Sequence, residues 1–335
     1  MGLIAPPETH VEEVATVRGR TLSLTVSGAG ESAILSGFGY SWGRDELDSL
    51  SRQFASVIVL PGDGLAEECA DGAFVFQIDF FPNGDKVCLA GPIPQEVLGW
   101  PTPLPRTGAV HHLSLSPTGS SLAILSSVLD PEQLKEGRRR YSKRELMVFG
   151  ENYSPGPIEA DAMRAVWSND ESALALLSGV GGIQVLETST WSETQSFGRP
   201  ARMVAFSPDN GLLAASRNES VEICDLAVGA GQRCTILGLQ YTSMDEPTWC
   251  RDGRCLWGWI PGAEGRYKLC REPLPSMFGL RGPDRFCIPE TESGEPGAFG
   301  LGPDGHLWVV LPDGEEEGPS ETNEESLDRL LRIEI

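Results

Sequence analysis

The sequence has few basic residues, few histidines and no long hydrophobic run. Lys and Arg total 26 against 48 Asp and Glu, which gives a net charge of −22. Phosphate backbones and anionic lipid surfaces repel such a chain, so nucleic acid and membranes are not expected as partners. No apolar stretch approaches the roughly 20 residues that a membrane-spanning helix needs. The amino terminus also lacks the basic and apolar regions of a secretory signal, which predicts a cytoplasmic protein.

The sequence also lacks the short motifs that mark common catalytic sites. It contains no Gly-x-Ser-x-Gly elbow, no His-Glu-x-x-His helix and no phosphate-binding glycine loop. Of its four histidines, the adjacent His111 and His112 lie on an expected strand, and neighbouring residues on a strand point to opposite faces. At most one of them faces a central channel, and a structural role is the simpler interpretation. No cofactor is expected.

The eight cysteines include no Cys-x-x-Cys pair. A zinc site of cysteines needs two such close pairs, so no metal is expected. For a long chain without a secretory signal, the default is reduced, buried cysteines. Cys250 with Cys255, and Cys224 with Cys234, nevertheless flank turns and could face each other across hairpins.

What the sequence does contain is a repeated unit, seen most clearly in VAFSPDNGLLAAS (204–216). An alternating apolar run, a turn of Pro, Asp, Asn and Gly, and a second run rich in Leu and Ala together predict a buried β-hairpin. Six related stretches occur, the first of them a weaker match. The residues that precede the seven turns are Ser27, Phe81, Ser116, Ser168, Ser207, Cys250 and Gly302. Their mean spacing is close to the roughly 40 to 45 residues of a four-stranded propeller blade.

The FSPDG-x-x-LA pattern resembles the WD40-like, or PD40-type, propeller repeat and covers nearly the whole chain. The Gly-His and Trp-Asp landmarks of WD40 repeats are missing, so the hydrogen-bonded tetrad of that family is not expected. We therefore expect one all-β domain over residues 1–335, a seven-bladed β-propeller of four-stranded blades. The stretch 327–335 supplies only one strand after the last hairpin, so 11–17 is expected to complete that blade and close the ring. A two-sheet sandwich is the alternative.

Departures from the repeat are expected to carry the function, because loops bind partners more often than packed strands do. Elaborated loops are predicted at 38–54, 128–145, 273–297 and 312–326. The Pro-rich stretch 271–297 can also contain the outer strand of the sixth unit together with an insertion. The loops of the first, third and seventh units connect the second strand to the third, and all such connections open on one face of a propeller. That rim is the predicted binding surface.

The loop of the third unit is strongly basic within an acidic chain. Arg forms bidentate pairs with carboxylates, which makes this loop a candidate docking site for an acidic segment. The candidate partner-binding residues are Lys135, Arg138, Arg139, Arg140, Lys143, Arg144 and, as an exposed anchor in the first loop, Trp42. The alternative is a solvated loop whose charge balances the acidic body.

These features predict a non-enzymatic β-propeller that acts as a protein–protein interaction module or as a regulatory or assembly subunit. Its partner is expected to be another protein, whose acidic segment docks on the basic loop 135–144. The alternative is a propeller hydrolase or lactonase with a central-channel site, with or without a metal.

Overall fold

Short antiparallel sheets make up the chain in the computed structural model. The described strands form six four-stranded sheets and one three-stranded sheet, and a single short 3-10 helix is described beside them. The structure describes residues 10–18, 21–26, 32–38, 53–59, 66–68, 75–83, 85–90, 96–102, 104, 109–129, 141–151, 156–178, 182–217, 220–227, 234–240, 247–262, 265–275, 284–291, 293, 296–302, 305–311 and 327–334.

We number the sheets in chain order. Sheets 1 to 3 comprise β2 (Thr21–Val26), β3 (Ser32–Phe38), β4 (Gln53–Val59) and β5 (Ala66–Glu68); β6 (Val75–Phe80), β7 (Lys86–Ala90) and β8 (Glu96–Leu98); and β9 (Ala109–Leu115), β10 (Ser121–Leu129), β11 (Tyr141–Gly150) and β12 (Ile158–Glu159). Sheets 4 and 5 comprise β13 (Arg164–Trp167), β14 (Ala173–Ser178), β15 (Gly182–Glu187) and β16 (Ser192–Phe197); and β17 (Met203–Phe206), β18 (Leu212–Ser216), β19 (Val221–Asp225) and β20 (Cys234–Leu237). Sheets 6 and 7 comprise β21 (Thr248–Trp249), β22 (Cys255–Pro261), β23 (Tyr267–Pro273) and β24 (Phe286–Cys287); and β25 (Phe299–Leu301), β26 (His306–Leu311), β27 (Leu327–Glu334) and β1 (Val11–Arg18).

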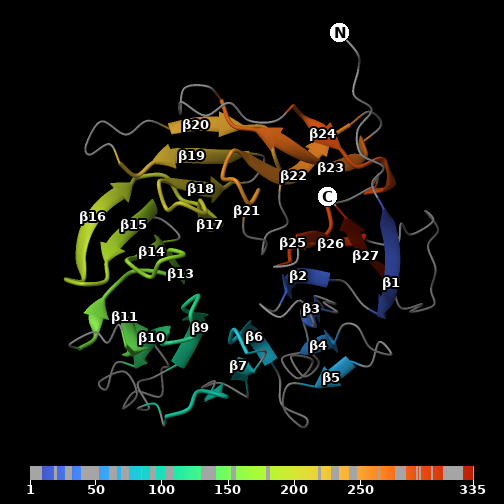
Figure 1. Cartoon of the computed structure of the whole chain (residues 1–335). Helices are drawn as coiled ribbons and strands as arrows, with labels where there is room; N and C mark the ends of the chain where they lie inside the picture. Colours follow the sequence, from blue (N-terminus) through green and yellow to red (C-terminus); the bar gives the residue numbers. More distant parts are fainter. Residues whose placement is uncertain are drawn as a thin grey trace, which may run out of the picture.

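The sheets lie side by side around a common centre, which is the arrangement of a β-propeller (Figure 1). Strand β9 contacts β6 of the preceding sheet and β13 of the following one, and β17 contacts β13 and β14. Strand β2 contacts β25 and β26 of sheet 7, while β4 contacts β6 of sheet 2. The fold is therefore all-β and of the propeller type.

Sheet 7 combines strands from the two ends of the chain. Strand β1 pairs antiparallel with β27, from Val11 opposite Ile333 to Arg18 opposite Leu327. Strand β27 also pairs with β26, which brings the first and last described strands into one sheet.

In the repeated hairpins of sheets 3 to 5, the second strand lies inside its sheet and is covered on both faces. All five residues of β18 are buried, as are residues 121–127 of β10. The neighbouring sheets provide this cover, as in the core formed by residues of sheets 4 and 5. Such double burial explains why the second run of the repeat is almost continuously apolar instead of alternating.

The turn between the first two strands is closed by a serine in sheets 3, 4 and 5. In sheet 5 the Ser207 hydroxyl oxygen accepts a hydrogen bond from the Leu212 N–H at 2.9 Å and donates one to Asp209 Oδ1 at 2.6 Å. Ser116 and Ser168 accept equivalent bonds from the N–H groups five residues onward. The repeat therefore encodes a turn that is stabilised by its own side chains.

Sheet 6 closes the same turn with a disulfide. Cys250 and Cys255 occupy the positions of Ser207 and Leu212, and the Cys250 N–H donates to the Cys255 carbonyl at 2.9 Å as the Ser207 N–H does to Leu212. The expectation of reduced cysteines is thus corrected for this pair. The cysteines face each other because the hairpin register brings these positions together.

Two further disulfides, one in sheet 5 and one in sheet 6, each join the third and fourth strands of a single sheet. Cys224 and Cys234 are directly opposite each other on β19 and β20, with Cα atoms 4.2 Å apart. Cys270 and Cys287 are opposite on β23 and β24, with Cα atoms 4.0 Å apart. Each bond ties a short outer strand to its sheet, and these four cysteines also depart from the reduced state expected of them.

The correspondence between Cys250–Cys255 and Ser207–Leu212 yields a stability prediction. The variant C250A/C255L should lose about 2 kcal/mol of unfolding free energy with the disulfide. The variant C250S/C255L should recover roughly 0.5–1.5 kcal/mol of this loss, because it recreates the serine-to-backbone hydrogen bond of sheet 5. Urea denaturation of both variants measures the difference. Equal stabilities would contradict the proposed equivalence of the two turns.

Candidate functional site

Most residues of the predicted binding rim lie outside the described part of the chain. This holds for Trp42, Lys135, Arg138, Arg139 and Arg140. It also holds for the greater part of the three predicted loops, at 39–52, 130–140 and 312–326.

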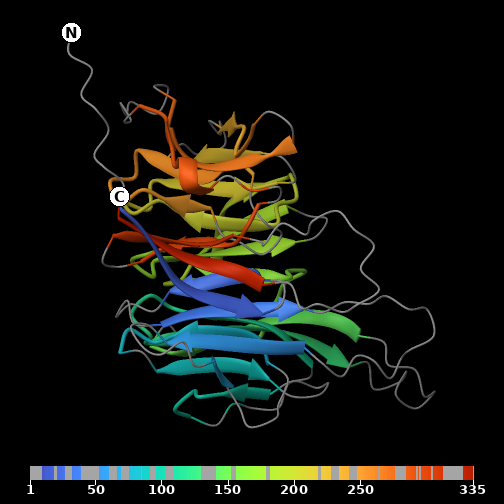
Figure 2. The same ribbon diagram turned by 90° about the vertical axis from the view of Figure 1, so that its right-hand side faces the viewer.

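The described part of the rim is the stem of the β10–β11 hairpin. The two strands pair as far as Leu129 opposite Tyr141. The first strand of the sheet stops pairing at Ser127, and the fourth pairs only with Glu145 and Leu146 of β11. The stem therefore extends beyond both flanking strands, and the green strands of sheet 3 project from the side of the ring in Figure 2.

This pairing corrects the bounds of the predicted loop 128–145. Residues 128–129 and 141–145 are strand residues, so Lys143 and Arg144 lie on β11 and not in a loop. Arg144 Nη1 lies 3.3 Å from Asp161 Oδ1, and both side chains are exposed, at 38% and 72%. Exposed ion pairs of this kind contribute little to stability.

The predicted loop 273–297 also contains regular structure. Strand β24 and the 3-10 helix η3 (Pro289–Thr291) lie within it. The Thr291 hydroxyl accepts the Leu269 N–H at 3.0 Å and donates to the Ile288 carbonyl at 2.7 Å. This segment thus supplies the fourth strand of sheet 6.

The inner strands are joined by side chains that reach from one sheet to the next. Gln77 Nε2 donates to the Leu113 carbonyl at 2.6 Å, and the Leu113 N–H donates to Gln77 Oε1 at 3.1 Å. Asp79 Oδ2 accepts the Leu115 N–H at 3.0 Å. Because β9 is the edge strand of sheet 3, these bonds provide partners for backbone groups that would otherwise lack them.

His112 forms the next connection around the ring. It is buried, and its Nε2 lies 3.1 Å from the Ala165 carbonyl of sheet 4. Burial lowers the pKa of His112 to about 3, against the opposing effect of the Ala165 hydrogen bond. The imidazole is therefore neutral at pH 7 and donates to the carbonyl. His111 is only partly buried, with Nδ1 3.5 Å from the Ser127 hydroxyl.

Asp79 is the other strongly perturbed group among the inner strands. Burial raises the pKa of its carboxyl to about 6, although the hydrogen bond from Leu115 N opposes this rise. Perturbed pKa values are common at catalytic sites, but structural networks produce them as well. The bonds of Asp79 and His112 to neighbouring backbone groups give both residues a structural role.

The turns between the first two strands contact one another on one face of the ring. Glu171 Oε1 of sheet 4 accepts the Thr118 N–H of sheet 3 at 2.8 Å. Asn210 Oδ1 of sheet 5 accepts the Asn169 N–H of sheet 4 at 2.9 Å. Glu171 and Asn210 both have φ of 59°, at a turn position that glycine occupies in sheets 3, 6 and 7. Their side chains compensate for the unfavourable backbone conformation by linking adjacent sheets.

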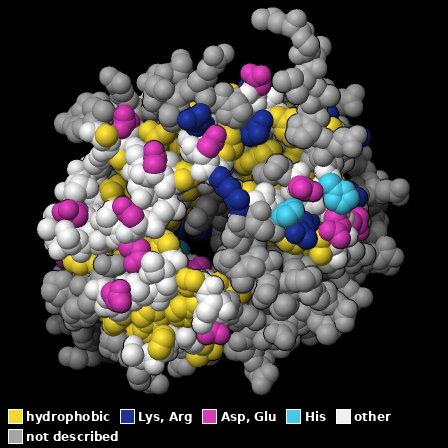
Figure 3. All heavy atoms as spheres, viewed as in Figure 1, with side chains coloured by type: hydrophobic (Ala, Val, Ile, Leu, Met, Phe, Trp, Pro, Cys, Tyr) yellow, Lys and Arg dark blue, Asp and Glu magenta, His cyan; other side chains and the backbone are white. Residues whose placement is uncertain are grey.

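A cavity of about 420 Å³ opens at the same face, between the turns of sheets 6 and 7. Arg251, Arg271 and His306 contribute cationic or titratable groups to its lining, and Asp252 and Glu334 contribute carboxylates. Basic, acidic and histidine side chains lie close together to the right of the central opening in Figure 3. The predicted site did not include this cavity, because its lining comes from two different repeats.

Departures from the repeat were the available signal for the cavity. Trp257 and Trp308 stand at the register position that Ala123, Ala175 and Ala214 occupy in sheets 3 to 5. The opposite residues on the third strand are Arg271 and Arg332 in sheets 6 and 7, and Val148, Val185 and Ile223 in sheets 3 to 5. Sheets 6 and 7 thus share a Trp–Arg pair where the other three have small and aliphatic residues.

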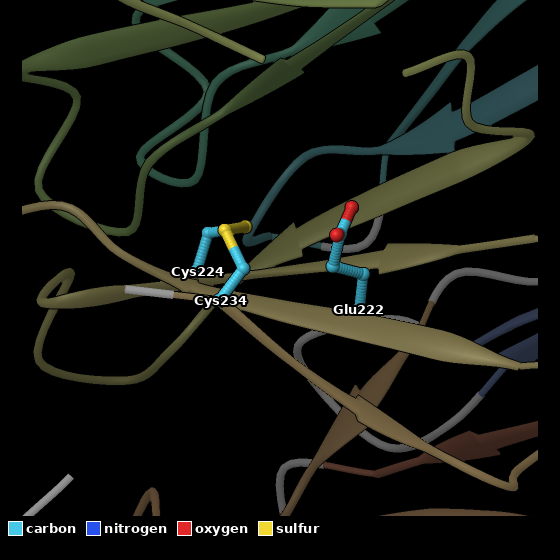
Figure 4. Close-up of side chains that lie close together, drawn as sticks. All are labelled: Glu222, Cys224 and Cys234. Carbon is cyan, nitrogen blue, oxygen red and sulfur yellow. A yellow bond between two sulfur atoms is a disulfide. The ribbon is translucent and has the colours of Figure 1, made fainter. Parts of the chain in front are cut away.

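Two groups of potential metal ligands occur among the described residues, and both contain a disulfide. Glu222 lies beside the Cys224–Cys234 disulfide, as Figure 4 shows, and its carboxylate forms ion pairs with Arg217 and Arg199. The second group combines Asp252 with the Cys250–Cys255 disulfide. A disulfide sulfur cannot act as a thiolate ligand, so neither group is a metal site in this state.

Comparisons with known proteins identify the fold only. No protein-family model matches the chain, and no curated protein matches its sequence. Among solved structures, 1190 chains match, which marks the fold as a common one. A chain from the crystal structure of a mitotic checkpoint complex aligns with all of this chain and 98% of its own length, with a TM-score of 0.59 and 15% identity. This likeness supports a WD40-like β-propeller fold, which by itself does not specify a function. No helix in the described residues is long and apolar enough to span a membrane.

The contact between Glu171 and Thr118 predicts the stability of variants at position 171. E171A should lower the unfolding free energy by roughly 1–3 kcal/mol at pH 7, because it leaves the Thr118 N–H without its partner. E171G should cost less, since glycine adopts a positive φ without strain. Denaturant titration measures both variants. The Thr118 hydroxyl also donates to Glu171 Oε1, and a double-mutant cycle with Thr118→Val isolates this second bond. Equal costs for Glu171→Ala in the wild-type and T118V backgrounds would contradict the hydroxyl contact.

The same contact makes a pH-dependent prediction for Glu171. Burial raises its pKa, but the hydrogen bonds from Thr118 and its neighbours outweigh this effect, so the pKa lies below the ordinary 4.5. Stability from a lowered carboxyl pKa is present above the ordinary value and lost as the pH falls through the lowered one. The difference between wild type and E171A should therefore narrow below pH 4.5.

His112 provides a test with a different pH range. Because its pKa is lowered from 6.5 to about 3, its contribution is complete above pH 6.5 and declines as the pH falls toward 3. H112A should cost roughly 1–3 kcal/mol at pH 7, and this cost should shrink in acid. Denaturation between pH 7 and 4 measures it, and NMR titration follows the imidazole directly. An imidazole that titrates near pH 6.5 would rule out the buried neutral state.

Proposed function

We propose that the chain is a closed, seven-bladed β-propeller of PD40-type repeats that binds another protein through one rim. The seven sheets would be the blades, and β1 with β27 would close the ring. The rim consists of the β3–β4, β10–β11 and β26–β27 connections, which leave the sheets at the end opposite to the linked turns. Proteins of this design act as interaction modules or as regulatory or assembly subunits.

The observation that carries this proposal is the β10–β11 stem, which extends beyond the strands on both sides of it. Lys143 and Arg144 lie on this stem, and the basic segment 135–140 connects its two strands. A cluster of basic residues on a chain of net charge −22 is suited to an acidic segment of a partner protein. The remaining, strongly acidic surface would repel nucleic acid and anionic membranes.

The polar side chains of the inner strands are better suited to joining the sheets than to catalysis. His112 is neutral and its Nε2 is held by the Ala165 carbonyl, while Asp79 accepts a backbone N–H. A general base must be directed at a substrate, whereas these bonds hold both side chains against backbone groups of the neighbouring sheet. We therefore propose a non-enzymatic role.

The three disulfides among the described residues bear on where the protein folds. The cytoplasmic location expected from the sequence stays a prediction. Structural disulfides form and persist in oxidising compartments and are rare in the cytosol. We propose that the three bonds form during maturation in an oxidising compartment, and alkylation of the protein in intact cells before lysis would decide between the two locations.

The rim can be tested with a charge-reversal variant that leaves β11 intact. R138E/R139E/R140E should reduce recovery of co-purifying proteins at least about tenfold, since each desolvated charge pair contributes strongly to binding. It should also abolish salt-sensitive binding of a labelled poly-glutamate peptide, measured by fluorescence anisotropy.

The matched control compares the single rim variant R139E with R254E, which reverses one charge at the turn of sheet 6, on the opposite face. R254E should bind the partner and the peptide as the wild type does. Recovery that is equally reduced in both variants would point to net charge and not to the rim. Undiminished recovery with R138E/R139E/R140E would refute the proposed docking surface.

A further inference from the structure

The cavity between sheets 6 and 7 combines features that its neighbours lack. The Cys250–Cys255 disulfide replaces a serine-to-backbone bond, and Trp257 and Arg271 replace the alanine and aliphatic residue of sheets 3 to 5. All four of these residues line the cavity. In a repeat protein, departures that gather in one place mark a surface whose role differs from packing alone.

The two arginines of the cavity are held in place by their surroundings. Arg271 lies over the Phe286 ring, with its Cζ 5.8 Å from the ring centroid. The Arg251 guanidinium lies against the turn of sheet 7, with Nη2 3.5 Å from the Gly302 carbonyl. If Gly305 carried a Cβ, that atom would be only 3.1 Å from Arg251 Cζ. Gly305, with φ of 90°, therefore leaves room for this guanidinium. Such preorganisation reduces the entropy that is lost when a ligand binds.

Arg271 has a donor without a partner. Its Nε is buried and forms no hydrogen bond with any of the described residues. An unsatisfied buried donor is costly, and for a charged group the cost is greater still. Arg271 also lines the cavity, so its positive charge attracts an anion bound there.

The remaining lining defines the kind of anion. Trp257, Leu301 and the disulfide provide an apolar surface, whereas Asp252 and Glu334 place negative charge in the lining. These carboxylates disfavour a multiply charged phosphate. A ligand with one negative charge and an apolar body fits both conditions, and the cavity volume lies within the roughly 300–1,000 Å³ of small-molecule sites.

We propose that this cavity binds a small monocarboxylate with an apolar body, whose carboxylate pairs with Arg271 and, at the mouth, with Arg251. Arginine forms two parallel N–H···O bonds with a carboxylate, which fixes the orientation of the ligand. The apolar body then lies against Trp257 and Leu301. This site is on the turn face and is independent of the rim proposed for the protein partner.

Phenylacetate is a suitable probe, with phenylacetamide as its neutral analogue and inorganic phosphate as the multiply charged one. Calorimetry and saturation-transfer NMR on the full chain should detect phenylacetate. Phenylacetamide and phosphate should each bind at least about tenfold more weakly, because one lacks the charge and the other the apolar body. Equal binding of phenylacetate and phenylacetamide, or no phenylacetate binding at millimolar concentration, would overturn the proposal.

Variants assign the binding to the two arginines. R271Q should weaken phenylacetate binding about tenfold or more, and R251Q should weaken it to a smaller extent. R254Q, a substitution at the same turn but outside the cavity lining, should bind as the wild type does. If R271Q fails to fold, R251Q against R254Q still decides, because both positions are exposed. Unchanged phenylacetate affinity in R251Q and R271Q would reject the site. The rim is tested separately, by recovery of the protein partner with R271Q.

Discussion

The structure depends on how the inner edge strand of each sheet obtains partners for its backbone groups. An edge strand presents unpaired N–H and C=O groups on one side, and the strands around the centre have no further strand beside them. Side chains of the neighbouring sheet take that place. Gln77 bonds both backbone groups of Leu113, in the manner of an adjacent strand, and His112 bonds the Ala165 carbonyl. Sheets 3 and 4 are therefore each completed by a side chain of the preceding sheet, which couples the stability of neighbouring sheets to a few polar side chains.

The same coupling determines where function can lie. In sheets 3 to 5 the turns are occupied with one another, through Glu171 and Asn210, and their polar groups have little capacity left for a ligand. Two surfaces escape this constraint. One is the rim, where connecting segments leave the sheets and the β10–β11 stem projects. The other is the junction of sheets 6 and 7, where an arginine against a glycine turn replaces the carboxylate or amide contact of the earlier sheets.

The sequence was informative where structure is encoded locally. The serine before the turn and the Asp, Asn or Gly within it specify each hairpin through contacts a few residues apart, so the hairpins at Ser116, Ser168 and Ser207 could be predicted. The register between distant strands could not, even where the strands themselves were expected. The Pro-rich stretch 271–297 was recognised as able to supply the fourth strand of sheet 6, but its sequence does not show that β24 places Cys287 opposite Cys270. The same holds for the extension of β10 and β11 and for the cavity lined by Arg251 and His306. Both arise from pairing between segments, which the sequence of either segment alone does not indicate.

The geometry shared by the repeated hairpins leaves no ligand site at a junction where the turns bond to each other. Such a turn is rigid because its polar groups form hydrogen bonds within the turn and with the next one. Groups that already have partners add little binding free energy when a ligand approaches. Sheet 6 secures its turn with a disulfide, which needs no polar group. Arg251 contacts the Gly302 carbonyl in the turn of sheet 7, Arg271 lies over the Phe286 ring, and both residues line the cavity. Covalent closure of the sheet 6 hairpin thus accompanies a charged junction in place of the carboxylate and amide contacts of sheets 3 to 5.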